Sequence, residues 1–221
     1  MSNLKKTVLD VQGSFFLSIF LAVVLAVIPL SVVAFIGANA EAATFTVTNL
    51  NDSNAGSLRQ AIADAEAAAG TDTINFSVSG TITLASTLPT ITDGAGLTMD
   101  GTGQTVTISG NNAVRVAIVD AGASLTLNNL TIANGSAAFL PPGTKYAGGI
   151  LNSGTLIITN STFSGNSTPT DSNIYEPYSG GAIYNSGSMT VTNSTFSGHR
   201  VVTNGAAIYN TATLNVTNST F

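Results

Sequence analysis

The chain has 221 residues, with six Lys and Arg, eleven Asp and Glu, and no cysteine. The lack of cysteine excludes disulfides and thiolate metal sites. The sparse, weakly acidic charge argues against nucleic-acid binding, which needs a basic surface.

The N-terminal segment has the features of an export signal. Lys5 and Lys6 precede an apolar stretch at 15–36, and two A-x-A sites follow, Ala38-Asn39-Ala40 and Ala40-Glu41-Ala42. This order is typical of a secretory signal peptide. The stretch covers 22 positions, enough to cross a bilayer, but Pro29 and the A-x-A sites favour cleavage. We predict a signal peptide over residues 1–43, with an N-terminal membrane anchor as the alternative, and export of the remainder either way.

Residues 44–96 are predicted to cap a larger fold. Apolar residues recur at helical spacing at Leu58, Ala61, Ile62 and Ala65, which predicts a helix over 57–69. Ser57 can cap its N-terminus and Gly70 can end it. Such a helix would cover core side chains and unpaired strand edges at the open end of a solenoid.

Residues 97–221 contain a repeat. One pattern recurs as Leu125-x-Leu127-x-Asn129, Leu156-x-Ile158-x-Asn160, Met189-x-Val191-x-Asn193 and Leu214-x-Val216-x-Asn218. The asparagines are separated by 31, 33 and 25 residues. Twenty-five residues fit three short strands and three turns, so the longer coils carry loops. The sequence therefore predicts an all-β fold, a right-handed parallel β-helix.

Each repeat position has an expected structural role. The alternating aliphatic residues would stack in the interior, and threonines would point outward. Phe163, Phe196 and Phe221 would form another interior stack. The four asparagines would occupy a corner and hydrogen-bond from coil to coil, and Asn152, Asn185 and Asn210 would form a second ladder. Because the repeat stops at Phe221 without a cap, we expect the chain to be truncated from a longer solenoid.

Two motifs resemble those of known bacterial surface proteins. Gly180-Gly181-Ala182-Ile183 and Phe163-x-x-Asn166 are similar to the GGA[ILV] and FxxN repeats of chlamydial polymorphic outer-membrane proteins. The segment from Thr46-Val47-Thr48 through Gly56-Ser57-Leu58-Arg59-Gln60-Ala61-Ile62 resembles the CSLREA-type N-terminal motif, with Gly56 in place of cysteine and Gln60 in place of glutamate. The resemblance implies a pectin-lyase-like β-helix in an exported, often adhesive protein. A second FxxN copy ends in His199, a departure from the pattern.

Catalysis is the less favoured reading of the sequence. Parallel β-helices include polysaccharide lyases and glycosidases, which need clustered or facing carboxylates. Asp93 and Asp100 each precede glycine and are interpreted as turn formers. Asp171, Glu176 and Arg200 form the single arrangement that could support catalysis. His199 is interpreted as a solvated surface residue. We predict no catalytic or metal-binding residues and no cofactor.

The favoured functional surface is a pair of loops. The inserts at 133–147 and 164–179 precede the same strand, so they should emerge at one corner of successive coils. Loops on a rigid scaffold often bind ligands, and aromatic residues among a few charges suit a carbohydrate or a protein. The expected ligand-binding residues are Phe139, Lys145, Tyr146, Asp171, Tyr175, Glu176 and Tyr178.

The sequence thus favours an exported, non-catalytic adhesion or structural module, secreted or at the cell surface. Its partner would be a carbohydrate or a protein of a host or neighbouring cell. Membrane attachment would come only from the N-terminal segment or from an anchor beyond residue 221. The alternatives are a lyase-like or glycosidase-like enzyme whose active site lies beyond residue 221, and a passive stalk.

Overall fold

The computed structural model describes residues 41–137, 146–168, 179–201 and 204–221. Sixteen strands in this part of the chain form three parallel sheets, called A, B and C here. Sheet A contains β1 (Thr44–Val47), β2 (Asp72–Phe76), β4 (Leu97–Asp100), β7 (Ser124–Asn128), β10 (Thr155–Thr159), β13 (Ser188–Thr192) and β16 (Thr213–Thr217). Sheet B contains β3 (Gly80–Thr83), β5 (Val106–Ser109), β8 (Leu130–Ala133), β11 (Thr162–Ser164) and β14 (Thr195–Ser197). Sheet C contains β6 (Ala117–Val119), β9 (Ile150–Asn152), β12 (Ile183–Asn185) and β15 (Ile208–Asn210).

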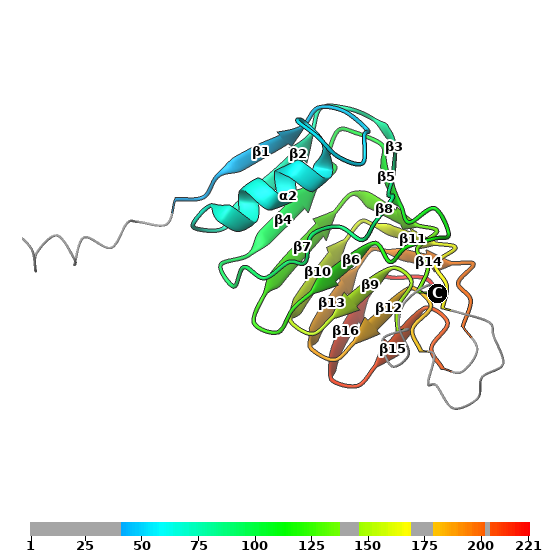
Figure 1. Ribbon diagram of the computed structural model, residues 1–221. Coiled ribbons are helices and arrows are strands. Elements are labelled where there is room, and N and C mark those ends of the chain that lie inside the picture. The colour runs from blue at the N-terminus through cyan, green and yellow to red at the C-terminus, as the bar shows by residue number, and fades with distance from the viewer. Residues whose placement is uncertain (1–40, 138–145, 169–178, 202–203) are drawn as a thin grey trace, which may run out of the picture. The chain divides into compact units, whose positions relative to one another are not determined.

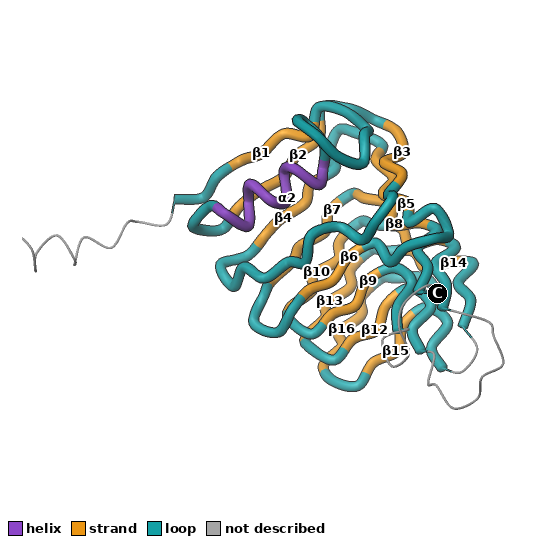
Figure 2. Tube along the Cα trace, in the orientation of Figure 1, coloured by secondary structure: helices purple, strands orange, loops and turns teal. Residues whose placement is uncertain are grey.

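From β4 on, the chain visits sheets A, B and C in turn, so each of these coils adds one strand to each sheet (Figures 1 and 2). The earlier strands β1, β2 and β3 belong to sheets A and B. Leu125, Leu156, Met189 and Leu214 are register partners in sheet A, as the repeat predicts. Residues that face the interior are buried in one continuous core. The parallel β-helix expected from the sequence is therefore confirmed.

The β-helix begins earlier than residue 97, the boundary expected from the repeat. Strand β2 pairs with β4, and β3 pairs with β5. Ile74 is the register partner of Met99 and is fully buried. These early coils lack the asparagine and phenylalanine corner residues of the later repeat, so sequence comparison misses their period.

Helix α2 (Leu58–Ala67) packs against β1 and β2 at the start of the β-helix (Figure 1). The side chains of Leu58, Ala61, Ile62 and Ala65 are buried, as predicted. The Ser57 hydroxyl accepts a hydrogen bond from the Gln60 N–H at 3.2 Å, which confirms the N-cap. The helix stops two residues before the expected end because Ala68 adopts extended backbone angles.

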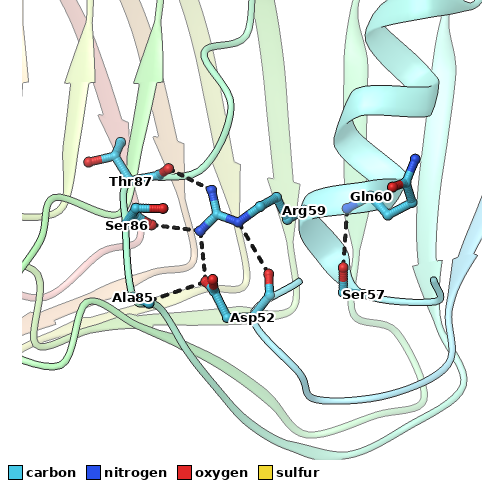
Figure 3. A network of polar contacts seen from close by, with 7 residues as sticks. All are labelled: Asp52, Ser57, Arg59, Gln60, Ala85, Ser86 and Thr87. Carbon is cyan, nitrogen blue, oxygen red and sulfur yellow. Dashed lines mark hydrogen bonds and ion pairs between the residues drawn. The ribbon is translucent and has the colours of Figure 1, made fainter. Parts of the chain in front are cut away.

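Arg59 connects α2 to two other segments (Figure 3). Its guanidinium forms an ion pair with Asp52 at 2.7 Å and donates to the carbonyls of Ser86 and Thr87 at 2.7 Å each. Asp52 also accepts from the N–H of Ala85 at 3.2 Å. Arg59 therefore connects α2 to the segment that follows β3.

Gly56, which stands where the CSLREA-type motif has cysteine, has a specific conformation. Its φ is +78°, which favours glycine, and a Cβ there would lie 2.2 Å from the Thr48 hydroxyl oxygen. The Gly56 carbonyl accepts hydrogen bonds from the N–H groups of Thr48 and Asn49. A side chain at this position would disturb the close contact with this loop.

The two asparagine corners differ. Asn129, Asn160, Asn193 and Asn218 all have φ near +50°, so this corner uses the tolerance of asparagine for left-handed backbone. Its coil-to-coil amide contacts are long: Asn160 donates to Asn128, and Asn193 donates to Asn160, at 3.4 Å each.

The second corner contains a short, buried ladder. Asn152 donates to the side-chain oxygen of Asn185, and Asn185 donates to that of Asn210, both at 2.6 Å. Asn152 and Asn185 are fully buried. The coil-to-coil amide ladder is therefore strong at this corner and weak at the first.

The predicted signal or anchor lies almost wholly outside the described residues. Within the ranges given above, the structure contains no helix of the length and apolarity that a membrane span requires.

Candidate functional site

The described ends of the two loop inserts lie in register on successive coils. The first insert leaves after Ala137 and the second after Thr168, and Ser136 and Ser167 form a parallel bridge. Where the inserts return, the N–H of Ala147 donates to the Ser179 carbonyl at 3.2 Å. Both inserts therefore leave from and return to the same corner, between sheets B and C.

Close backbone approach shapes the return corner. The N–H of Gly148 donates to the Gly181 carbonyl at 3.0 Å. A Cβ on Gly148 would lie 2.3 Å from the Ser167 carbonyl, and one on Gly181 would lie 2.3 Å from the Ala206 carbonyl. The glycine pairs of the GGA[ILV]-like motif therefore permit tight stacking beside the inserts.

Sheet C begins directly after this corner, and its outward face is apolar and aromatic. The central residues of its strands are register partners and half-buried: Ile118, Leu151, Tyr184 and Tyr209. Outward positions in sheets A and B are mostly threonine, serine or asparagine. Sheet C thus presents a different surface from the other two.

Tyr146, at the end of the first insert, packs on this face. Its ring centroid lies 4.6 Å from that of Tyr184, with a 40° tilt, and Tyr184 lies 5.4 Å from Tyr209, with a 31° tilt. We call Tyr146, Tyr184 and Tyr209 the tyrosine stripe. Because each ring contacts the next, the three form one continuous surface that crosses successive coils.

Arg115 holds the first insert where it returns to the coil. Its Nε donates to the Ala147 carbonyl at 3.0 Å, and its guanidinium also donates to the Tyr146 carbonyl. The side chain is buried, and burial lowers the pKa of Arg115 to about 10. The guanidinium is still charged at neutral pH, so it can fix the backbone of Tyr146 beside the stripe.

Of the seven residues expected to bind ligand, Tyr146 lies in the described part of the chain. The other six lie outside the described residues: Phe139, Lys145, Asp171, Tyr175, Glu176 and Tyr178. Sequence reasoning missed Tyr184 and Tyr209. The signal was present, since each occupies the outward position of a repeated Ile-Tyr-Asn strand.

Asp93 and Asp100 each accept a hydrogen bond within a turn. Asp93 accepts a hydrogen bond from the N–H of Ala95 at 2.8 Å, and Asp100 accepts one from the N–H of Thr102 at 2.9 Å. Partial burial raises the pKa of Asp100, but hydrogen bonds from Thr102, Asn128 and Asn129 outweigh that effect and lower it below its ordinary 3.8. Both aspartates are turn formers, as interpreted from the sequence.

His199 is not the solvated surface residue that the sequence suggested. It is half-buried, and its Nδ1 accepts a hydrogen bond from the N–H of Asn166 at 3.2 Å. In the preceding coil, the Asn166 side chain accepts from the N–H of Gly135 at 2.8 Å. The imidazole thus takes the place of the asparagine amide in the FxxN pattern, which gives His199 a structural role.

Catalytic groups do not come together in the described residues. Among them, no three His, Asp or Glu side chains are arranged to hold a metal ion. Arg200, one member of the single catalytic arrangement considered above, is exposed, and its expected partners Asp171 and Glu176 lie outside the described residues. No protein-family model matches the chain, and no curated protein matches it.

Proposed function

We propose that this protein is an exported, non-catalytic binding module, secreted or held at the cell surface, that binds a carbohydrate or a protein. The tyrosine stripe and the adjoining insert corner form the binding surface. The observation that carries this proposal is the packing of Tyr146, from an insert, onto Tyr184 and Tyr209 of the scaffold.

The stripe has physical properties that suit binding. Tyrosine supplies a large amphipathic contact area and loses little conformational entropy, since it has two side-chain torsions. Here the rings are already packed against one another and against a sheet, so ordering them costs little when a ligand binds. Sheet C also displays Ile118 and Leu151, which extend the apolar area along the same face.

Export is proposed from the N-terminal sequence. The basic residues, apolar stretch and A-x-A sites are typical of a secretory signal. A place among the CSLREA-type or chlamydial repeat proteins, with their pectin-lyase-like fold, is a proposal that rests on the motifs quoted above.

The test is a binding screen with matched variants. The exported protein would be applied to an array that carries both polysaccharides and extracellular-matrix proteins. Tyr184→Ala with Tyr209→Ala should weaken binding by about tenfold or more, because aromatic anchors dominate binding energy. The control replaces two outward threonines of sheet B, Thr107→Ala with Thr131→Ala, and should leave binding unchanged. Binding that survives the tyrosine changes would show that the stripe is not the binding surface. No binding by the parent protein would leave the passive stalk as the better account.

A further inference from the structure

A buried carboxylate lies beneath the start of the first strand. Asp72 opens β2 and is 1% exposed. Its Oδ1 accepts a hydrogen bond from the backbone N–H of Ala43 at 2.8 Å. Its Oδ2 is also buried and has no hydrogen-bond partner among the described residues.

An ionised carboxylate is destabilised in this position, because it is buried and one of its oxygens has no hydrogen-bond partner among the described residues. A buried carboxylate is normally paired with a cation or satisfied by several hydrogen bonds. Among the described residues, the ion pair found is Arg59 with Asp52, and the Arg59 guanidinium is directed to the carbonyls of Ser86 and Thr87 as well. The described residues thus place no cationic side chain on Asp72, and the nitrogen that contacts its Oδ1 is that of Ala43.

Ala43 is held in place by the sheet. Its carbonyl accepts a hydrogen bond from the N–H of Thr73 at 2.8 Å, and β1 begins at the next residue. Glu41 and Ala42, which precede it, are exposed and belong to no strand. The Ala42–Ala43 peptide bond thus lies at the junction between an exposed segment and a fixed one.

The same bond follows the second A-x-A site, Ala40-Glu41-Ala42. A signal peptidase cuts after such a site. Cleavage after the first site, Ala38-Asn39-Ala40, would instead leave Glu41 as the first residue and would keep the Ala43 nitrogen as a neutral amide. The two sites therefore differ in whether they place a charge against Asp72.

We propose that export cleaves the chain between Ala42 and Ala43 and that the new α-ammonium group of Ala43 forms an ion pair with the buried Asp72. A signal peptidase adds one water across the C–N bond: Ala42 gains the carboxylate, and Ala43 gains an amine that takes up a proton. The three ammonium protons can then serve both carboxylate oxygens. Cleavage thus supplies the buried Asp72 carboxylate with a cationic partner. The inference rests on the export proposed above and is independent of the tyrosine stripe.

The first experiment identifies the mature N-terminus. The full chain would be expressed in a bacterium with a general secretory system, and the exported protein would be analysed by intact mass and N-terminal sequencing. The expected first residue is Ala43. Export with Glu41 as the first residue overturns this inference and leaves the proposed export intact, as does export without cleavage. Retention of the whole chain in the cytoplasm contradicts both.

The second experiment tests the ion pair itself. Protein that begins at Ala43 would be compared with the same chain acetylated on the Ala43 nitrogen, which keeps an N–H but removes the charge. At pH 7 the free amine should raise the midpoint of thermal unfolding by about 5 °C. The difference should disappear well above pH 8, the ordinary upper range for an α-amino pKa, once the amine is neutral in the folded protein.

Carboxylate variants complete this test. Asp72→Asn should abolish the difference between the free and acetylated forms. The matched control Asp120→Asn, at an exposed aspartate, should preserve it. Equal midpoints for the free and acetylated forms at pH 7, or a difference that survives Asp72→Asn, would overturn the ion pair.

Discussion

Asparagine occupies two corners of the coil, and it stabilises them in different ways. At the first corner its backbone adopts φ near +50°, and the amide contacts between coils are exposed and 3.4 Å long. At the second corner Asn152 and Asn185 are buried, and the three side chains are joined at 2.6 Å. The two corners should therefore respond differently to substitution.

Asn185→Ala should destabilise the protein by about 2–4 kcal/mol, because it removes several hydrogen bonds and leaves a cavity at a fully buried position. Asn185 accepts from Asn152 and donates to Asn210 and to the Thr213 carbonyl. At the first corner, Asn160→Gly should change stability by less than about 0.5 kcal/mol, since glycine adopts the same backbone angles freely. Urea unfolding of the two variants measures this contrast, and equal costs would contradict it.

His199 should make stability depend on pH. Burial lowers the pKa of His199 below its ordinary 6.5, and its Nδ1 needs a free lone pair to accept from Asn166. As the pH falls below about 6.5, the unfolded chain therefore binds a proton that the folded chain resists, and stability is lost. Above that pH the group contributes no pH dependence.

The measurement is urea unfolding at pH 7.5 and pH 5 for the parent and for His199→Asn. Asparagine is the residue at the same position of the preceding coil, where it accepts the equivalent hydrogen bond. The variant should lose a large part of the parent's destabilisation at pH 5. If it is destabilised by acid as much as the parent, His199 is not the responsible group.

At the scale of elements, α2 is joined to the first coil by both its apolar face and a polar clamp. Leu58 and Ile62 are fully buried, while Arg59 donates to the carbonyls of Ser86 and Thr87 (Figure 3). A helix of ten residues is marginal by itself in water. Its position therefore depends on these tertiary contacts.

Arg59→Ala should destabilise the cap by roughly 1–3 kcal/mol, since several charge-assisted hydrogen bonds are lost together. The ion pair is partly exposed, so the exposed Asp52–Arg59 attraction by itself contributes little. Arg59→Lys should recover only part of the loss, because an ammonium group cannot reproduce the planar fork. Hydrogen exchange should show the change in α2 and β1, and full recovery by lysine would contradict this account.

Sequence patterns predicted α2 and the later coils better than the early coils. The spacing of Leu58, Ala61, Ile62 and Ala65 was enough to predict the buried face of α2. The register of the later coils followed from identical residues at matching positions. The early coils were assigned to the capping region because burial requires only an apolar residue such as Ile74 or Ile82, whereas a detectable repeat requires the same corner residues.

Only part of the candidate site was predicted from the sequence, because the grouping of the three tyrosines depends on how the chain runs between the sheets. Loop inserts can be recognised as added length between repeats, and Tyr146 belongs to one of them. Tyr184 and Tyr209 lie within strands of the repeat, where they resemble scaffold. Their grouping with Tyr146 depends on which sheet the insert returns to, and that is a property of the three-dimensional path. The role of Arg115 depends on the same path.

At the scale of the whole molecule, the β-helix is a stack in which each coil contacts its neighbours. Phe163, Phe196 and Phe221 form one aromatic column, with ring centroids 4.8 and 4.9 Å apart and planes within 10° of each other. The stability of such a fold is close to a sum of coil and nearest-neighbour terms. A change in one coil should therefore have local effects.

Phe163→Ala should cost about 3–5 kcal/mol, because a fully buried ring is removed from the column. Amide hydrogen exchange should accelerate in β8, β11 and β14, which are paired around this residue. Exchange in α2 should be unchanged. A uniform acceleration that includes α2 would show that the fold unfolds as a single unit.

The central claim is that ligand binds to the tyrosine stripe on sheet C. The most direct measurement is hydroxyl-radical footprinting of the parent protein, with and without a ligand found on the array. Binding should reduce the oxidation of Tyr184 and Tyr209 by half or more, while Ile157, an outward residue of sheet A, stays as reactive as before. Protection of Ile157 without protection of the two tyrosines would contradict the account.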